Sequence, residues 1–351
     1  MSKKILVAMS GGVDSAAAAC LMLEQGHEVA GATFRLWKPE ESTAAMERDI
    51  NDSRIICETI GIPHYVLDYR EAFMDAVVKP FIAEYDMGKT PNPCIFCNRS
   101  IKLAAFLQSA NELGYDYIAT GHYARIEQDE NAIYRIRRAV YLPKDQSYVL
   151  YHVTQQQLAH LILPLGNITK DDARALTRKH GLVVQNRPES QDICFITDGD
   201  TGSFLDKYAA LPCPIGNFVD GNGNVLGTHR GVRHYTIGQR KGLGISTGQP
   251  VYVNAIDAFS GEITLSDNAS LFLPKLAANK LSWITKPDFT KPVRLSARIR
   301  YAHKPAPATV ELLDNGDKVT VLFDEAQRAI TKGQAVVFYD GDYLIGGGTI
   351  I

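Results

Sequence analysis

The sequence has no long hydrophobic run, and no stretch approaches the ~18 uncharged apolar residues that a membrane-spanning helix needs. The first apolar run is interrupted by Ser10, Gly11 and Gly12, which makes it too short for a secretory signal. Net charge is also nearly absent, because 37 Lys and Arg stand against 39 Asp and Glu. We therefore expect no membrane partner, and the charge of the whole molecule gives little attraction towards nucleic acid.

Cysteine is scarce as well. Six cysteines in 351 residues do not make the disulfide framework of a secreted protein. We expect a reducing, cytoplasmic location, in which paired cysteines indicate chemistry or metal binding. Cys20 and Cys57 lie on apolar helical stretches and are expected to be small buried side chains.

The small net charge hides an asymmetry. Residues 203–351 hold 16 Lys and Arg against 13 Asp and Glu, a net +3, whereas residues 1–202 hold 21 against 26, a net −5. A polyanion would therefore have to be bound by local patches. The candidate patches are Arg230, Arg233, Arg240 and Lys241 in a glycine-rich loop, and Arg294, Arg298, Arg300, His303 and Lys304 around Tyr301. Basic side chains interleaved with an aromatic suit RNA, although either patch could equally be solvated surface.

The first 202 residues alternate between strand-like apolar runs and helix-like segments joined by short links. Strands are predicted over 5–8, 28–37, 64–68 and 117–120, and helices over 13–25, 46–60, 71–85 and 101–113. This alternation predicts an α/β fold with a doubly wound parallel sheet, which binds ligands beyond the carboxyl ends of its strands. After about residue 202, Gly, Pro and Asn separate short strands, with a further soft boundary near 271–278. We therefore predict three domains, which are 1–202, 203–273 and 274–351.

The strongest motif follows the first predicted strand and opens a helix, and it reads Ser10-Gly11-Gly12-Val13-Asp14-Ser15. Paired glycines let backbone N–H groups approach an anion, and the helix N-terminus adds its dipole. Asp14 suits a divalent cation beside phosphates. A plain strand-to-helix turn is the alternative, and the missing lysine excludes the common Gly-x-x-x-x-Gly-Lys-Ser/Thr loop. The hexapeptide resembles the signature of the PP-loop ATP pyrophosphatases, which split ATP into AMP and pyrophosphate and usually adenylate an oxygen.

A second motif holds two cysteines in the run Lys89-Thr90-Pro91-Asn92-Pro93-Cys94-Ile95-Phe96-Cys97. A Cys-x-x-Cys pair can be half of a zinc site, a redox pair or two ligands of an iron–sulfur cluster. A zinc ribbon would need a second such pair, and none follows. Cys194 lies among ionisable neighbours outside the predicted regular elements, so we interpret it as a third reactive thiol.

Six motifs occur in order along the chain. They are Ser10–Ser15, Thr90–Asn98 (TPNPCIFCN), Ala119–Arg125 (ATGHYAR), Lys144–Leu150 (KDQSYVL), Ser190–Phe195 (SQDICF) and His234–Ile245 (HYTIGQRKGLGI). Together they resemble the tRNA-specific 2-thiouridylases over essentially the whole chain. The resemblance implies an adenine nucleotide alpha-hydrolase-like PP-loop domain followed by two small β domains, the last a β-barrel that contacts tRNA.

The resemblance also implies roles for individual residues. ATP with Mg²⁺ is expected on Ala8, Met9, Ser10, Gly11, Gly12, Val13, Asp14, Ser15, Phe34 and Gly121. The tRNA is expected on Asn92, Pro93, Cys94, His122, Lys144, Asp145, Gln146, Arg300, Tyr301 and Gln334. Catalysis would use Cys97, Cys194 and Cys94, with sulfur carried on Cys194 as a persulfide and released by Cys97, leaving a disulfide between the two. A persulfide carrier or a cysteine desulfurase would supply the sulfur.

This chemistry is coherent for 2-thiolation of the wobble uridine. The C2 oxygen of uridine is a poor leaving group, and adenylation converts it into AMP. A persulfide is a soft nucleophile suited to the activated carbon, and Mg²⁺ would offset charge on the phosphates. The base must also leave its stack to enter such a pocket.

One position departs from the family pattern, because familiar members have an Asp where this chain has Cys94. Cysteine cannot be assumed to take over its acid/base role. Three thiolates on Cys94, Cys97 and Cys194 could instead hold a [4Fe–4S] cluster, so the persulfide relay, the cluster and a structural Cys94 all remain open here. The rival functions are a different PP-loop amide ligase, which would lack an ammonia-supplying domain, and a non-catalytic RNA-binding protein with a zinc-stapled loop.

Overall fold

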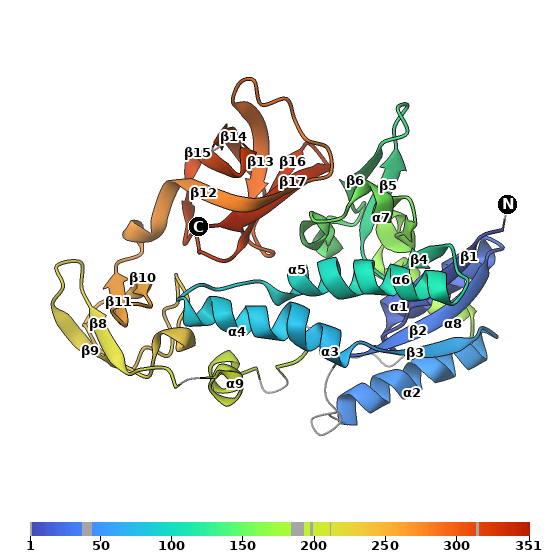
Figure 1. Cartoon of the computed structure of the whole chain (residues 1–351), viewed down its shortest axis with the longest axis horizontal. Helices are drawn as coiled ribbons and strands as arrows, with labels where there is room; N and C mark the ends of the chain where they lie inside the picture. Colours follow the sequence, from blue (N-terminus) through green and yellow to red (C-terminus); the bar gives the residue numbers. More distant parts are fainter. Residues whose placement is uncertain (1, 37–43, 184–192, 197–198, 211, 314–315) are drawn as a thin grey trace.

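The computed structural model describes residues 2–36, 44–183, 193–196, 199–210, 212–313 and 316–351. It contains a parallel sheet with helices, a small central sheet and a closed barrel (Figure 1). This architecture confirms the predicted fold class. None of the helices in the described residues is both long and apolar enough to cross a membrane.

The parallel sheet forms because short apolar strands are buried on both faces. Its strands are β1 (Lys4–Ala8), β2 (Glu28–Arg35), β3 (His64–Asp68), β4 (Tyr117–Ala119) and β7 (Leu161–Ile162), in the order β3-β2-β1-β4-β7. Ile5 and Val7 of β1 point to one face and pack with helices α1 (Val13–Glu24) and α2 (Ala44–Thr59). Leu6 points to the other face, where it packs with Phe106 of α6 (Phe106–Glu112). Helices therefore cover both faces, as a doubly wound sheet requires.

Two long helical rods run from the parallel sheet towards the central sheet (Figure 1). The first joins α3 (Arg70–Phe73), η2 (Met74–Val78) and α4 (Lys79–Asp86), and the second joins α5 (Pro93–Cys97), η3 (Asn98–Ala105) and α6. Segments η2 and η3 are widened π-helical turns, in which hydrogen bonds link residues five apart, as from the N–H of Phe106 to the carbonyl of Ile101. The second rod carries the Cys-x-x-Cys motif at its start.

The central sheet is small and has the order β10-β11-β8-β9. Its strands are β8 (Gly216–Val219), β9 (Val225–His229), β10 (Tyr252–Asp257) and β11 (Glu262–Ser266). Helix α9 (Thr201–Tyr208) precedes it. The remaining short helices are η4 (Leu142–Lys144), η5 (Ser147–Leu150), α7 (Gln155–Leu158), η6 (Pro164–Asn167), α8 (Lys170–Lys179), η7 (Val232–His234) and η8 (Ala269–Leu271).

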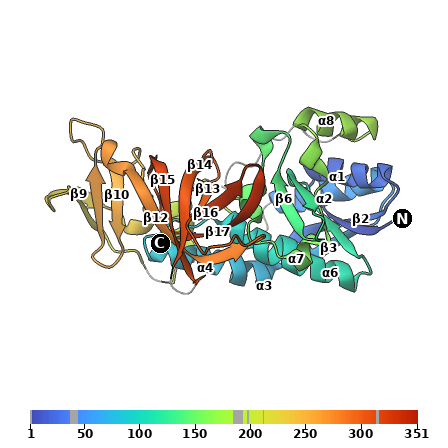
Figure 2. The same ribbon diagram turned by 90° about the horizontal axis from the view of Figure 1, so that it is seen from above.

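The barrel is closed because β12 pairs with both β15 and β17. Its strands are β12 (Phe272–Trp283), β13 (Val293–Arg298), β14 (Ala306–Leu313), β15 (Lys318–Arg328), β16 (Ala335–Asp340) and β17 (Tyr343–Ile350). Strand β17 also pairs with β6 (Tyr134–Arg138), which forms a hairpin with β5 (Ala124–Gln128) (Figure 2). The hairpin therefore links the part of the chain that holds the parallel sheet to the barrel through continuous hydrogen bonding.

Candidate functional site

The strand order of the parallel sheet reverses beside β1, since β2 lies on one side of it and β4 on the other. Ligands of such sheets bind beyond the carboxyl ends of the strands at this point. Ser10–Ser15 follows β1 and Thr120–His122 follows β4, so two motifs that are far apart in sequence meet at one edge.

The Ser10–Ser15 loop has the shape of an anion site. Gly11 has a φ of +70°, and a Cβ there would lie 3.0 Å from Cβ of Asp52. The hydroxyl oxygens of Ser10 and Ser15 are 3.2 Å apart. Gly12, which precedes α1, provides no side-chain cap, so the first-turn N–H groups suit an external anion.

Gly121 closes over this loop. A Cβ on Gly121 would lie 3.1 Å from the carbonyl carbon of Asp14 and 3.1 Å from the backbone nitrogen of Ser15. Only glycine lets the chain after β4 approach the loop so closely. The glycine cradle and the uncapped helix start together fit the phosphates of ATP.

Asp14 lies within a group of cations at this loop. Its carboxylate accepts hydrogen bonds from Nζ of Lys170 at 2.7 Å and from the hydroxyl of Tyr123 at 2.8 Å. Burial lowers the pKa of Lys144, and the nearby charges of Lys170 and Arg174 lower it further. Lys144 therefore lies near the nucleotide loop, although it was predicted to contact tRNA. Sequence reasoning missed Lys170, which lies 156 residues from Asp14.

Met9 and Phe34 belong to the packing around the loop. Met9 is buried, and its N–H donates to the carbonyl of Ala32 at 2.8 Å. The Phe34 ring lies at the end of β2 with its centroid 4.9 Å from that of Phe106 and 5.3 Å from that of Tyr69. Phe34 thus lies one strand away from the loop that it was predicted to assist.

The second rod begins at the Cys-x-x-Cys motif. Oδ1 of Asn92 caps α5 by accepting from the N–H of Cys94 at 3.0 Å, and Pro93 occupies the first helical position. The Asn98 side chain donates to the carbonyl of Cys94 at 2.9 Å. These contacts fix a helical start on which Cys94 is exposed and Cys97 is buried.

The structure brings Cys94, Cys97 and Cys194 into electrostatic reach of one another. The Cys194 residue is exposed, but protein atoms packed around its thiol remove water from it, and this desolvation raises the pKa of the thiol to about 12. The charges of Cys97 and Cys94 raise the same pKa further. Burial likewise raises the pKa of Cys97. All three are free thiols, and within the described residues no group of three His, Cys, Asp or Glu could hold a metal ion. Ser190, Gln191 and Asp192 of the same motif lie outside the described residues.

Lys102 is a cation of this site that sequence reasoning missed. It lies five residues after Cys97 within η3, and a π-helical turn brings residues five apart onto the same face. Its charge lowers the pKa of both Cys97 and Cys194. Lys102 faces the cysteines because this helix is widened, and the sequence alone does not reveal the widening.

His122 is buried just after β4 and lies in electrostatic reach of Lys102. Its Nδ1 lies 2.8 Å from Oγ1 of Thr120. Burial lowers its pKa to about 3, with a further contribution from the charge of Lys102. His122 is therefore neutral at physiological pH and can offer hydrogen bonds but no positive charge to a phosphate.

Three of the predicted tRNA residues, Gln146, Arg300 and Tyr301, are held by different contacts. Gln146 exchanges hydrogen bonds with the backbone of Tyr123, through its side chain at 3.0 Å and its N–H at 2.9 Å. The guanidinium of Arg300 donates to the carbonyls of Arg328 and Ala329 at 2.7 Å each. Tyr301 is exposed, its ring centroid lies 6.1 Å from that of Tyr148, and its hydroxyl lies in electrostatic reach of Cys94.

Thr90, which precedes the cysteine motif, contacts all three parts of the chain. Its N–H donates to the carbonyl of Lys332 at 2.9 Å, and its carbonyl accepts from the Gln334 side chain at 2.7 Å. Its hydroxyl donates to that of Thr236 in the central part at 3.2 Å. Gln334, predicted to contact tRNA, therefore holds the start of the cysteine motif.

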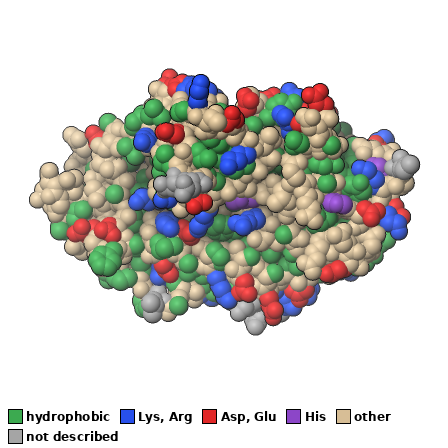
Figure 3. Space-filling model, turned by 45° about the horizontal axis from the view of Figure 1, so that its top comes forward, with side chains coloured by type: hydrophobic (Ala, Val, Ile, Leu, Met, Phe, Trp, Pro, Cys, Tyr) green, Lys and Arg blue, Asp and Glu red, His purple; other side chains and the backbone are tan. Residues whose placement is uncertain are grey.

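The two basic patches differ from simple RNA-binding surfaces. Arg233 is buried and pairs with Asp86 at 2.6 Å, and Arg294 pairs with Asp324 at 2.6 Å. Figure 3 shows Lys and Arg side chains gathered across the middle of one face, with histidine between them.

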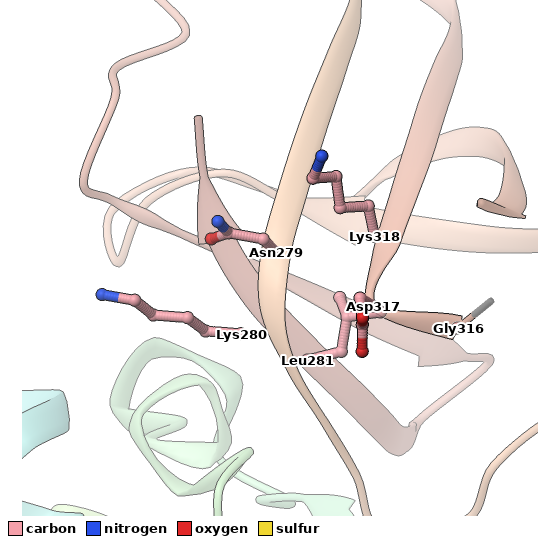
Figure 4. A pocket seen from close by; sticks show the side chains of 6 residues that line it. All are labelled: Asn279, Lys280, Leu281, Gly316, Asp317 and Lys318. Carbon is pink, nitrogen blue, oxygen red and sulfur yellow. The ribbon is translucent and has the colours of Figure 1, made fainter. Parts of the chain in front are cut away.

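A hollow of about 400 Å³ on the barrel is lined by none of the predicted site residues (Figure 4).

Comparisons with known proteins cover the whole chain. Family models named tRNA methyl transferase HUP domain, tRNA methyl transferase PRC-barrel domain and aminomethyltransferase beta-barrel domain match residues 3–198, 202–267 and 274–350. The chain is 46% identical to tRNA-specific 2-thiouridylase MnmA of Clostridioides difficile, covering 100% of this chain and 98% of that protein. It is 49% identical to the protein of the same name from Carboxydothermus hydrogenoformans, covering 99% and 97%.

Similarity to solved structures is much weaker. The U34-tRNA thiolase NcsA of Methanococcus maripaludis with its [4Fe–4S] cluster gives a TM-score of 0.35 at 19% identity, over 59% of this chain and 67% of that one. At that level it carries no argument about a cluster here. The full-length relatives at nearly half identity are decisive, and the chain belongs to the tRNA-specific 2-thiouridylase family.

Proposed function

We propose that this protein is a tRNA-uridine 2-sulfurtransferase that thiolates the wobble uridine (U34) at C2, consuming ATP and releasing AMP and pyrophosphate. The observation that carries the proposal is the full-length similarity to 2-thiouridylases of a chain that has both a phosphate cradle and three free cysteines. A methyltransferase, as the family models are named, would leave both the cradle and the cysteines without a role.

In the first step, the Ser10–Ser15 loop and Gly121 bind ATP while the C2 oxygen attacks the α-phosphate. Mg²⁺, when bound, supplies charge compensation for the phosphates, and Asp14 would hold it. Lys170 and Lys144 lie at the same loop, so they would stabilise the pyrophosphate that leaves. The product of this step is an adenylated uridine whose C2 carbon accepts a nucleophile.

In the second step, the terminal sulfur of a persulfide on Cys194 attacks C2, and AMP leaves with the original oxygen. The Cys97 thiolate then attacks the inner sulfur of Cys194 and breaks the S–S bond. The sulfur stays on the uridine, and a Cys97–Cys194 disulfide remains. Reduction of that disulfide and renewal of the persulfide require an external thiol and a sulfur donor, for which we propose a persulfide carrier or a cysteine desulfurase.

The cluster-dependent variant is not favoured, because the described cysteines form no group able to hold a metal ion and the relatives carry the 2-thiouridylase name. Cys94, which is exposed on α5, would then face the target base without a ligand role. The assignment of tRNA contacts to Asn92, Pro93, Cys94, His122, Lys144, Asp145, Gln146, Arg300, Tyr301 and Gln334 and the division into 1–202, 203–273 and 274–351 stay predictions.

The test is nucleoside mass spectrometry of tRNA incubated with the protein, ATP and a sulfide or persulfide source. Cys97→Ala and Cys194→Ala should abolish 2-thiouridine, whereas Cys213→Ala in the central part should not. Iron and acid-labile sulfide are counted in the same preparation. Full activity of both cysteine variants would refute the persulfide relay. Activity proportional to the iron content would instead support the cluster-dependent mechanism. Binding of tRNA without release of AMP would indicate a non-catalytic RNA-binding protein.

A further inference from the structure

Arg298 lies at the end of β13, where the chain enters the 299–305 segment that carries Arg300 and Tyr301. The sequence places it in a basic patch suited to RNA. In the structure it is only 9% exposed, so its guanidinium is directed into the protein. A buried cation of this kind acts on its neighbours more than on a phosphate backbone in solvent.

The guanidinium of Arg298 joins two segments of the proposed site. Nη1 lies 3.3 Å from Oδ2 of Asp145, and Nη2 donates to the carbonyl of Tyr301. The Cζ atom of Arg298 lies 5.3 Å from the ring centroid of Tyr148 and 5.4 Å from that of Tyr301. Arg298 thus binds the KDQSYVL segment with one nitrogen and the barrel segment with the other, between two aromatic rings.

The Asp145 end of this link is itself fixed. Asp145 is 4% exposed and accepts from the N–H of Ala139 at 3.1 Å and the hydroxyl of Ser147 at 2.9 Å. The Ser147 oxygen lies 3.1 Å from the hydroxyl of Tyr339, which must donate, because the single proton of Ser147 is given to Asp145. These hydrogen bonds fix the position of the Asp145 carboxylate, and therefore the place at which it can bind Arg298.

The free end of the link is the ring of Tyr301. This side chain is 44% exposed although its backbone carbonyl is held, and its ring centroid lies 6.1 Å from that of Tyr148 in η5. A base that has left its helical stack is commonly bound against an aromatic ring. Tyr301 has the exposure and the place for that contact.

We propose that Arg298 is a positioning residue for thiolation. It holds Tyr301 against Tyr148, which packs in the same core cluster as Ile95 of the cysteine motif, so that the displaced base meets the cysteines. The inference rests on the proposed function, because it assumes that a base is brought to that site. A lysine at this position would keep the charge but could not reach Asp145 and the Tyr301 carbonyl with separate nitrogens.

The experiment compares Arg298→Lys and Arg298→Met with the wild type by single-turnover formation of 2-thiouridine and by tRNA binding at several salt concentrations. Both variants should thiolate about ten- to a hundredfold more slowly, the cost typical of a misplaced reacting group. The dependence of tRNA affinity on salt should stay unchanged, whereas loss of a phosphate contact would reduce its slope by about one. Lys291→Met, an exposed charge removed just before β13, is the matched control.

A double variant separates positioning from folding, because Arg298→Met alone leaves the buried Asp145 carboxylate with the longer ion pair to Arg138, at 3.8 Å, in place of two. Arg298→Met with Asp145→Asn removes both charges and should regain thermal stability without regaining the thiolation rate. Full recovery of the rate in this double variant, a wild-type rate in Arg298→Lys, or a reduced salt slope would each overturn the proposal. A wild type that forms no 2-thiouridine would instead refute the proposed function itself.

Discussion

Replacing Gly121 by alanine tests the closest approach in the nucleotide site. The new Cβ would lie 3.1 Å from two backbone atoms of the Ser10–Ser15 loop and 3.2 Å from Cβ of Asp14. Neither the loop backbone nor β4 can yield as a flexible side chain would, so the loop must shift by a few tenths of an ångström. Overpacking of this kind costs about 1–3 kcal/mol.

Because each ~1.4 kcal/mol corresponds to a factor of ten, and the shifted atoms carry the N–H groups for the phosphates, ATP affinity should fall by about ten- to a hundredfold. Titration calorimetry with ATP and Mg²⁺ measures this directly, without tRNA or a sulfur source. Gly221→Ala is the control, since a Cβ there meets nothing within 4 Å. Unchanged ATP affinity in Gly121→Ala would show that the loop does not bind the phosphates.

Three further substitutions and conditions have defined outcomes. Lys102→Met should raise the pKa of the exposed Cys194, because a positive charge that lowers it is lost, and slower alkylation of Cys194 by iodoacetamide at pH 8 would report this; an unchanged rate would exclude Lys102 from the site. His122 is neutral in the folded protein, so its contribution to stability is full above about pH 6.5 and is lost as the pH falls towards about 3. Its NMR signals should therefore not titrate between pH 5 and 8, and a midpoint near 6.5 would contradict the burial. Gly333→Ala places a side chain at a φ of +89° and 3.0 Å from Cβ of Lys89, so thermal unfolding should show a loss of about 1–2 kcal/mol.

The sequence predicted those parts of the site that depend on neighbours along the chain. The Ser10–Ser15 loop follows a buried strand and opens a helix, and both features were visible as an apolar run and paired glycines. The cysteine motif was equally visible, and Asn92 and Pro93 begin its helix as their preferences predict. Local patterns therefore identified the chemistry of each motif.

Partners distant in sequence were out of reach. Lys170 and Asp14 are separated by 156 residues, and Arg298 and Asp145 by 153, so no local pattern links either pair. Arg298 was interpreted as an RNA contact because a basic strand looks the same whether its charges face solvent or a buried carboxylate.

Strand β17 contains the run Gly346-Gly347-Gly348, a composition that is typical of turns. In the barrel a Cβ on Gly346 would lie 2.3 Å from the carbonyl oxygen of Ser282, and one on Gly347 would lie 2.6 Å from that of Val336. Glycine is needed here because neighbouring backbones approach closely on both sides. A glycine run that is a loop in most sequences is a packed strand in this one.

The hydrogen bonds of β17 also tie the cysteine motif to the barrel. Ile350 pairs with Gln334 and Gly333, and so supports the turn that contacts Thr90 ahead of the cysteine motif. The nucleotide loop, by contrast, follows β1 in the parallel sheet. Loosening of the barrel should therefore displace the start of the cysteine motif before it disturbs the nucleotide loop.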